Sequence, residues 1–151
     1  MSSSTTEDSW PIRDFVGYGG KSPIDHWPNR ARVAINFVLN VEESSEPSVP
    51  DGDGYTENRL TDSTVNLGND RDLAAEGLFE YGSRAGFWRI HREFQRRKIP
   101  LTIFACAVAL ERNPLITEAI IDAGYDVCSH GYRWVNHRVL DEASEREQIA
   151  L

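Results

Sequence analysis

Three short apolar runs, separated by patterns typical of helices, limit most strongly the folds that this chain can adopt. The runs are ARVAINFVLNV at residues 31–41, LTIFACAVAL at 101–110 and YDVCS at 125–129. Their near-continuous apolar character is typical of strands that are buried on both faces of a parallel sheet. We therefore expect three buried strands in one sheet.

Helical patterns fill the stretches between and after these runs, within residues 81–100 and at 114–124 and 141–151. Gly82 and Ser83 predict a turn that caps the first of these helices. Pro114 suits the first position of the second helix, and Gly124 suits its C-terminal end. Strands that alternate with helices predict an α/β fold, with a parallel sheet and helices packed outside it.

Composition narrows the class of protein. The 151 residues are enough for one domain with a core, and 40% hydrophobic with 26% charged residues is typical of a soluble globular protein. A net charge of −8 disfavours nucleic acid or an anionic membrane as the main partner. The opening MSSSTTEDSW lacks the features of a secretory signal, and no apolar run is long enough to span a membrane. With Cys106 and Cys128 expected as buried free thiols, we predict a cytoplasmic protein.

Domain boundaries follow from the same reading. We expect a disordered tail at residues 1–9 and one domain at 10–151. The polar stretch 44–80 is long for a loop in a compact domain, which favours a functional loop that covers a pocket or contacts another subunit. A closed barrel typically needs about 250 residues, so three strands predict the N-terminal part of a barrel, truncated at its C-terminus.

Polar side chains follow two of the predicted strands. Glu42 and Glu43 come directly after the first run, and His130 comes directly after the third. Ligand sites in parallel sheets gather at the carboxyl ends of the strands. A carboxylate and a histidine that meet there can act as base and acid on a bound water. A helix cap or solvated loop for Glu43, and a structural role for His130, are the alternatives.

The segment GYDVCSHGYRW resembles the part of the polysaccharide deacetylases (the NodB homology group) that carries two metal-binding histidines four residues apart. INFVLNVEE occupies the place of the family's strand with two functional aspartates. His130 matches the first histidine, but Trp134 stands at the second, and Val38 and Asn40 stand at the aspartates. Indole cannot bind a metal and a neutral amide is a poor zinc ligand, so we expect no metal here.

Four further motifs resemble one subgroup of that superfamily, the cofactor-independent allantoinases: RDFVGYGG at 13–20, EYGSRAGFWR at 80–89, ALERNP at 109–114 and SHGYRW at 129–134. The resemblance implies part of a distorted (β/α) barrel of the polysaccharide deacetylase type. It implies hydrolysis of the cyclic amide of allantoin to allantoate, with no cofactor and with a small ureide as the partner. It also suggests a homo-oligomer.

Hydrolysis without a metal requires a side chain that takes the proton of the attacking water. We predict that His130 and Glu42 form this acid/base centre, with their separate roles unassigned. Asn40 and Glu43 are predicted to bind substrate. Arg133 is predicted to pair with a carboxylate and so hold the loop that follows His130.

Two further residues are predicted to contact the substrate. Arg84 offers a planar guanidinium to the substrate carbonyls, with an ion pair to Glu80 as the alternative. Trp134 offers a flat wall to the ring, with packing beneath the loop as the alternative. At the level of the whole chain, an N-deacetylase for chitin-type polymers and a non-catalytic truncated remnant are the alternatives to an allantoinase.

Overall fold

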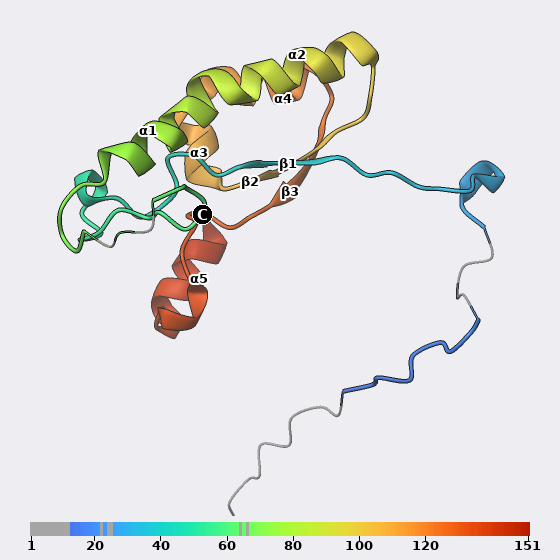
Figure 1. The fold of residues 1–151 in the computed structure, drawn as a ribbon, viewed down its shortest axis with the longest axis horizontal. Helices are drawn as coiled ribbons and strands as arrows, with labels where there is room; N and C mark the ends of the chain where they lie inside the picture. Colours follow the sequence, from blue (N-terminus) through green and yellow to red (C-terminus); the bar gives the residue numbers. More distant parts are fainter. Residues whose placement is uncertain (1–12, 22, 24–25, 64, 66) are drawn as a thin grey trace, which may run out of the picture. The chain divides into compact units, whose positions relative to one another are not determined.

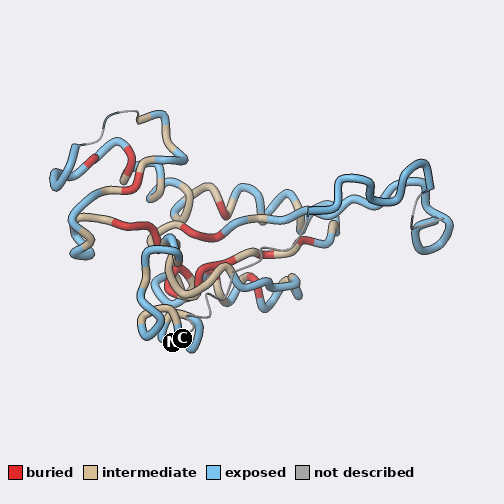
Figure 2. The backbone as a smooth tube through the Cα atoms, turned by 90° about the horizontal axis from the view of Figure 1, so that it is seen from below, coloured by how far each residue is buried: buried red, intermediate tan, exposed pale blue. Residues whose placement is uncertain are grey.

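The computed structural model describes residues 13–21, 23, 26–63, 65 and 67–151 (Figure 1). The chain divides into two compact units, Met1–Ile35 and Asn36–Leu151. In the first unit the described residues are exposed (Figure 2) and include a short 3-10 turn, η1 (Pro28–Arg30). The predicted tail at residues 1–9 lies outside the described residues.

A three-stranded parallel sheet organises the second unit. Its strands are β1 (Val38–Val41), β2 (Thr102–Ala105) and β3 (Asp126–Ser129), in the spatial order β1-β2-β3. The register sets Val41 beside Ala105 and Ala105 beside Ser129. The predicted parallel α/β sheet is therefore confirmed, and the carboxyl ends of its three strands meet at one edge.

The helices of the second unit follow the strands in the expected alternation. They are α1 (Leu73–Tyr81), α2 (Phe87–Arg97), α3 (Ala107–Arg112), α4 (Pro114–Asp122) and α5 (Glu142–Ala150), with 3-10 turns η2 (Val49–Asp51) and η4 (His137–Val139). The predicted Pro114 start of α4 is confirmed, and Gly124 adopts a left-handed φ of 63° just after its end. None of the helices in the described part of the chain is long and apolar enough to cross a membrane.

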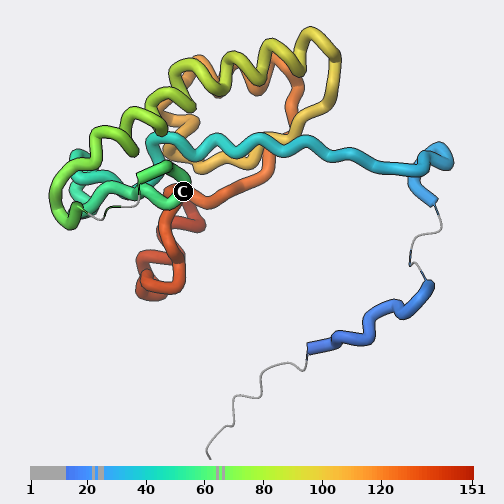
Figure 3. Tube along the Cα trace, viewed as in Figure 1, coloured from blue at the N-terminus to red at the C-terminus, as the bar shows by residue number. Residues whose placement is uncertain are grey.

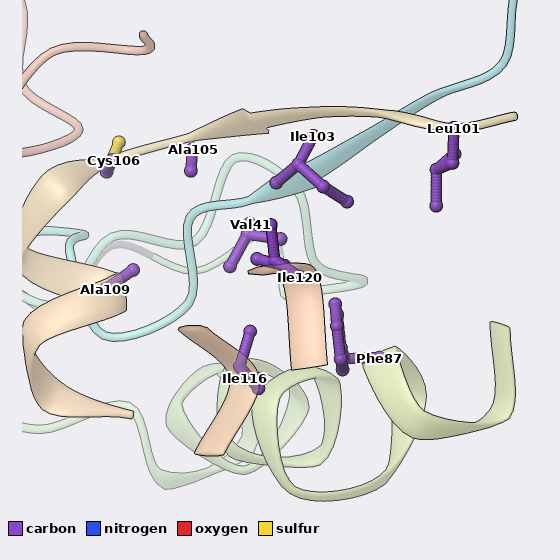
Figure 4. Close-up of a cluster of buried hydrophobic side chains, with 9 residues drawn as sticks. All are labelled: Val41, Phe87, Leu101, Ile103, Ala105, Cys106, Ala109, Ile116 and Ile120. Carbon is purple, nitrogen blue, oxygen red and sulfur yellow. The ribbon is translucent and has the colours of Figure 1, made fainter. Parts of the chain in front are cut away.

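The core lies between one face of the sheet and the helices. Val41 of β1 and Ile103 of β2 meet Phe87 of α2 and Ile116 and Ile120 of α4 (Figure 4). Within the described unit the other face of the sheet has no such cover. The prediction that the strands are buried on both faces is therefore wrong for β1 and β3.

The same geometry corrects two further expectations. All four residues of β3 are exposed because it is an edge strand, so Cys128 is exposed while Cys106 is fully buried. The predicted strand at residues 31–41 is only four residues long. β2 begins at Thr102 opposite Val38, and the Thr102 N–H donates to the Phe37 carbonyl at 3.0 Å just before β1 begins.

The helix before β2 is longer than the sequence predicts. α1 and α2 are joined by a π-helical turn, η3 (Gly82–Gly86), and Figure 3 shows the chain from Leu73 to Arg97 as one continuous coil. The predicted turn at Gly82 and Ser83 is therefore wrong, since Gly82 has helical angles (φ −53°, ψ −55°). Asp72 caps this helix and accepts the N–H groups of Ala74 and Ala75, so the predicted loop 44–80 contains most of a helix.

Candidate active site

Glu42 and His130 reach the same edge of the sheet because each directly follows a strand. The His130 N–H donates to the carbonyl of Ala105 at 2.8 Å, and the Cys106 N–H donates to the carbonyl of Val41 at 3.0 Å. These two hydrogen bonds extend the sheet pattern by one residue at each side of β2. The backbone at both candidate residues is therefore held by the sheet.

The two side chains are in contact. His130 Nε2 lies 3.4 Å from Glu42 Oε1, and Glu42 is only 7% exposed. The Asn40 amide donates to the same Glu42 oxygen. The second oxygen, Oε2, is buried and has no hydrogen-bond partner among the described residues. One oxygen of this carboxylate is thus oriented by its neighbours, and the other is a buried acceptor that the described residues leave unsatisfied.

The neighbours of the pair fix its orientation. The imidazole of His130 stacks on the Phe104 ring, with 4.0 Å between the centroids and 28° between the planes. The Glu42 carbonyl accepts both the Ser45 N–H at 2.8 Å and the Ser45 hydroxyl at 2.5 Å. The Ser45 carbonyl in turn accepts the Trp134 N–H at 3.1 Å. This chain of contacts joins the loop after β1 to the loop after β3.

Two further glutamates, Glu43 and Glu46, follow Glu42 in the same loop, and burial raises the pKa of both carboxyl groups. Glu43 Oε2 accepts the Glu42 N–H at 3.2 Å, and its side chain lies against Gly82 of the π turn. Glu46 is buried, and one of its oxygens lacks a hydrogen-bond partner in the described part of the chain. Since desolvation disfavours the charged form, protons are held more tightly here than on exposed carboxylates.

The other predicted binding residues are placed less centrally. Arg84 pairs with Glu80 at 3.0 Å and is 77% exposed, which is the alternative arrangement for it. Trp134 is partly buried, packs against the core, and lies 6.4 Å from the Phe79 ring. The structure therefore brings Glu42, His130, Asn40 and Glu43 together. Substrate contacts of Arg84 and Trp134 stay predictions.

Two arginines anchor the loop that follows β1. Arg133 makes the predicted pairing with a carboxylate: its two terminal nitrogens each lie 2.8 Å from an oxygen of Asp53. Arg112 does the same with Asp51, at 2.9 and 3.0 Å, and also donates to the Ser44 carbonyl. Sequence reasoning missed Arg112 and both aspartates. The acidic turn DGDG at 51–54 was the available signal.

The donors near Glu42 do not fit the metal site of the wider family. The polar partners of its carboxylate in the described part of the chain are His130 and the neutral Asn40, and Trp134, at the place of the second histidine, packs against the core. Among the described residues, no three His, Cys, Asp or Glu side chains are grouped so that they could hold a metal ion. One carboxylate, one imidazole and a neutral amide fall short of the three His, Cys, Asp or Glu ligands that a catalytic zinc site uses.

Comparison with known proteins places the chain among its relatives. The profile of the polysaccharide deacetylase family matches residues 73–151. A Schizosaccharomyces pombe protein named as a polysaccharide deacetylase is 39% identical over 145 residues, which is 93% of this chain and 45% of the relative. The chain thus spans about half the length of this relative.

Two solved structures resemble the chain closely. The crystal structure of Puue allantoinase has a TM-score of 0.85 and 46% identity, over 94% of this chain and 47% of that one. The structure of a probable polysaccharide deacetylase from Pseudomonas aeruginosa PAO1 has a TM-score of 0.84 and 46% identity, over 91% and 47%. The predicted fold, part of a (β/α) barrel of the polysaccharide deacetylase type, is confirmed by both.

Proposed function

Because this chain belongs to the polysaccharide deacetylase family, we propose that it supplies the acid/base centre of a hydrolase for carbon–nitrogen bonds. We propose further that the bond is the cyclic amide of allantoin or a similar ureide, and that no metal takes part. The observation that carries this proposal is the contact between His130 and the buried Glu42, with Asn40 as the third polar group.

The chemistry requires one water and one shuttled proton. One member of the His130–Glu42 pair takes a proton from the water while the water oxygen forms a bond to the ring carbonyl carbon. The carbon–nitrogen bond then breaks, and the same proton passes to the departing ring nitrogen. The pair returns to its starting state, and the product is a carboxylic acid on an open ureide, which releases its remaining proton to solvent and becomes a carboxylate. The partner of the proton-accepting group stabilises the charge that forms during transfer.

The 46% sequence identity to Puue allantoinase supports a ureide as the substrate. The residues that stand in place of the family's metal ligands support the same substrate. Trp134 offers an aromatic surface where an imidazole would bind metal, which suits a flat ring. Arg84, Asn40 and Glu43 complete the proposed substrate contacts. The proposal includes a cytoplasmic, homo-oligomeric protein with neither nucleic acid nor membrane as partner, in keeping with the net charge of −8.

N-deacetylation of chitin-type polymers is the second candidate, because the Pseudomonas aeruginosa protein is equally identical to this chain. The two candidates differ in their use of a metal. We would measure allantoate formation from allantoin and acetate release from chitin oligomers, each with a strong chelator and with added zinc. Allantoate formation that survives chelation supports the proposal, and acetate release that depends on zinc would replace it.

Variants then test the pair itself. Glu42→Gln and His130→Ala should each lower kcat by about 100-fold or more. Glu118→Gln, which removes an exposed carboxylate on α4, should leave kcat unchanged. Because the chain spans about half of its relatives, the same variants should also be made in a fusion with the unmatched part of Puue allantoinase. A fusion that stays fully active with Glu42→Gln would refute the assignment.

A further inference from the structure

Gly82 lies where the helix from Leu73 to Arg97 changes from α to π geometry. Its backbone angles are ordinary right-handed helical ones, so its conformation does not require a glycine. Glycine is also a poor helix former, and alanine would favour this part of the helix more. The reason for a glycine must therefore lie in what surrounds the position.

The space beside Gly82 is filled by Glu43. A Cβ built on Gly82 would lie 2.7 Å from Glu43 Cγ and 2.8 Å from Cδ, and it would overlap Oε1. Real Cβ atoms essentially never come closer than 3.0 Å to another heavy atom. The Glu43 side chain thus occupies the place that any larger residue at position 82 would take.

The far end of Glu43 reaches the candidate acid/base pair. Its Oε2 accepts the N–H of Glu42 at 3.2 Å, and Glu42 Oε1 lies 3.4 Å from His130 Nε2. Burial raises the pKa of Glu43, as expected for a carboxyl group that is partly removed from water. A displacement of Glu43 would therefore remove a hydrogen bond from the backbone that carries Glu42.

We propose that Gly82 is a positioning residue. The missing side chain makes a seat for the Glu43 carboxyl group on the helix, and Glu43 in turn holds the backbone of Glu42 at its distance from His130. The catalytic consequence rests on the proposed function, but the seat itself does not.

A double-mutant cycle tests the seat. Gly82→Ala should lower the Tm by at least about 2 °C, because the added Cβ displaces Glu43. The higher helix propensity of alanine offsets only part of this loss. In a Glu43→Ala background the overlap is gone, so Gly82→Ala should leave the Tm unchanged or raise it. Gly77→Ala is the matched control in the same helix. Its Cβ would meet nothing within 4 Å, so the Tm should not fall.

The activity of the same variants tests the consequence. Gly82→Ala should lower kcat about 10- to 100-fold and should shift the pH profile of kcat, whereas the loss of Glu43 as a substrate contact alone would change KM and leave that profile in place. In the Glu43→Ala background it should have no further effect on kcat.

A Gly82→Ala protein that matches Gly77→Ala in Tm, or whose loss persists without Glu43, would overturn the seat. The positioning role would be overturned if Gly82→Ala lowers the Tm only when Glu43 is present but leaves kcat and its pH profile unchanged in an active enzyme. Absence of allantoate formation in the unmodified protein would count against the proposed function alone, because the Tm cycle is read without substrate.

Discussion

Asp53→Asn tests whether the Arg133–Asp53 pair anchors the loop after β1. The substitution keeps the shape of the side chain and removes its charge. Both members of the pair are largely enclosed, with side chains 21% and 19% exposed, and Arg133 also donates to the Glu46 carbonyl at 3.2 Å. The change therefore leaves a mostly buried guanidinium without its counter-ion.

The magnitude follows from this degree of burial. Breaking a fully buried pair costs about 3–5 kcal/mol, whereas an exposed pair contributes about 0–1 kcal/mol. The Asn oxygen can keep one hydrogen bond to Arg133, which reduces the loss to about 2 kcal/mol. For a chain of this size the Tm should fall by about 4–8 °C. Thermal unfolding followed by circular dichroism near neutral pH measures this.

A matched control separates burial from charge. Glu93 pairs with Arg96 at 2.6 Å on α2, but these side chains are 51% and 65% exposed. Glu93→Gln should cost less than about 1 kcal/mol. The hydrogen bond from Arg133 also holds the pKa of Asp53 below its usual 3.8. Its stabilising effect is thus complete above that pH and is lost as the pH falls through the folded-state pKa. If Asp53→Asn cost no more than Glu93→Gln, the anchoring role would be refuted.

Three further predictions use other parts of the structure. Glu43→Gln should stabilise the protein above a pH of about 4.5 and not below it, because burial raises the pKa of Glu43 and penalises its charged form. Urea unfolding at several pH values measures this. Ile103→Ala on the central strand β2 should cost about 2–5 kcal/mol, and Val127→Ala at its register partner on the edge strand β3 should cost under about 1 kcal/mol; equal costs in urea unfolding would contradict a core that covers β2 but not β3. A thiol reagent should modify Cys128 in the native protein and reach Cys106 only after unfolding, because Cys106 is buried and its pKa is raised by burial; two equally reactive thiols would contradict this.

The sequence predicts the parallel sheet and the meeting of Glu42 with His130 for one reason. Both residues directly follow apolar runs, and parallel strands bring their carboxyl ends to a common edge. The position of each side chain along the chain was therefore enough to predict their contact. The cap of α5 at Asp141 is predictable from local sequence, because an aspartate directly before a helical pattern is a favoured N-cap. In the structure its side chain accepts the Ser144 N–H at 2.7 Å.

The features that the sequence does not predict are contacts between residues that lie far apart along the chain. Asp53 lies 80 residues from Arg133, and no local pattern identifies that pair. The sequence pattern predicts a capping turn at Gly82 and Ser83, whereas Gly82 lies within the helix and its neighbour in space is Glu43. The exposure of Val127 on β3 follows from which elements cover the sheet, and an apolar run carries no information about that cover.

The π turn rotates the residues of α2 about the helix axis, relative to where a regular α-helix that continues α1 would place them. Successive residues of an α-helix are rotated by about 100°, so an extra residue taken up in the turn rotates everything beyond it relative to a regular helix. Ala75 is buried on one side of the turn and Phe87 on the other. Shortening the segment 82–86 by one residue would turn one of these two out of its contacts. The length of this turn, as much as its composition, is therefore under structural constraint.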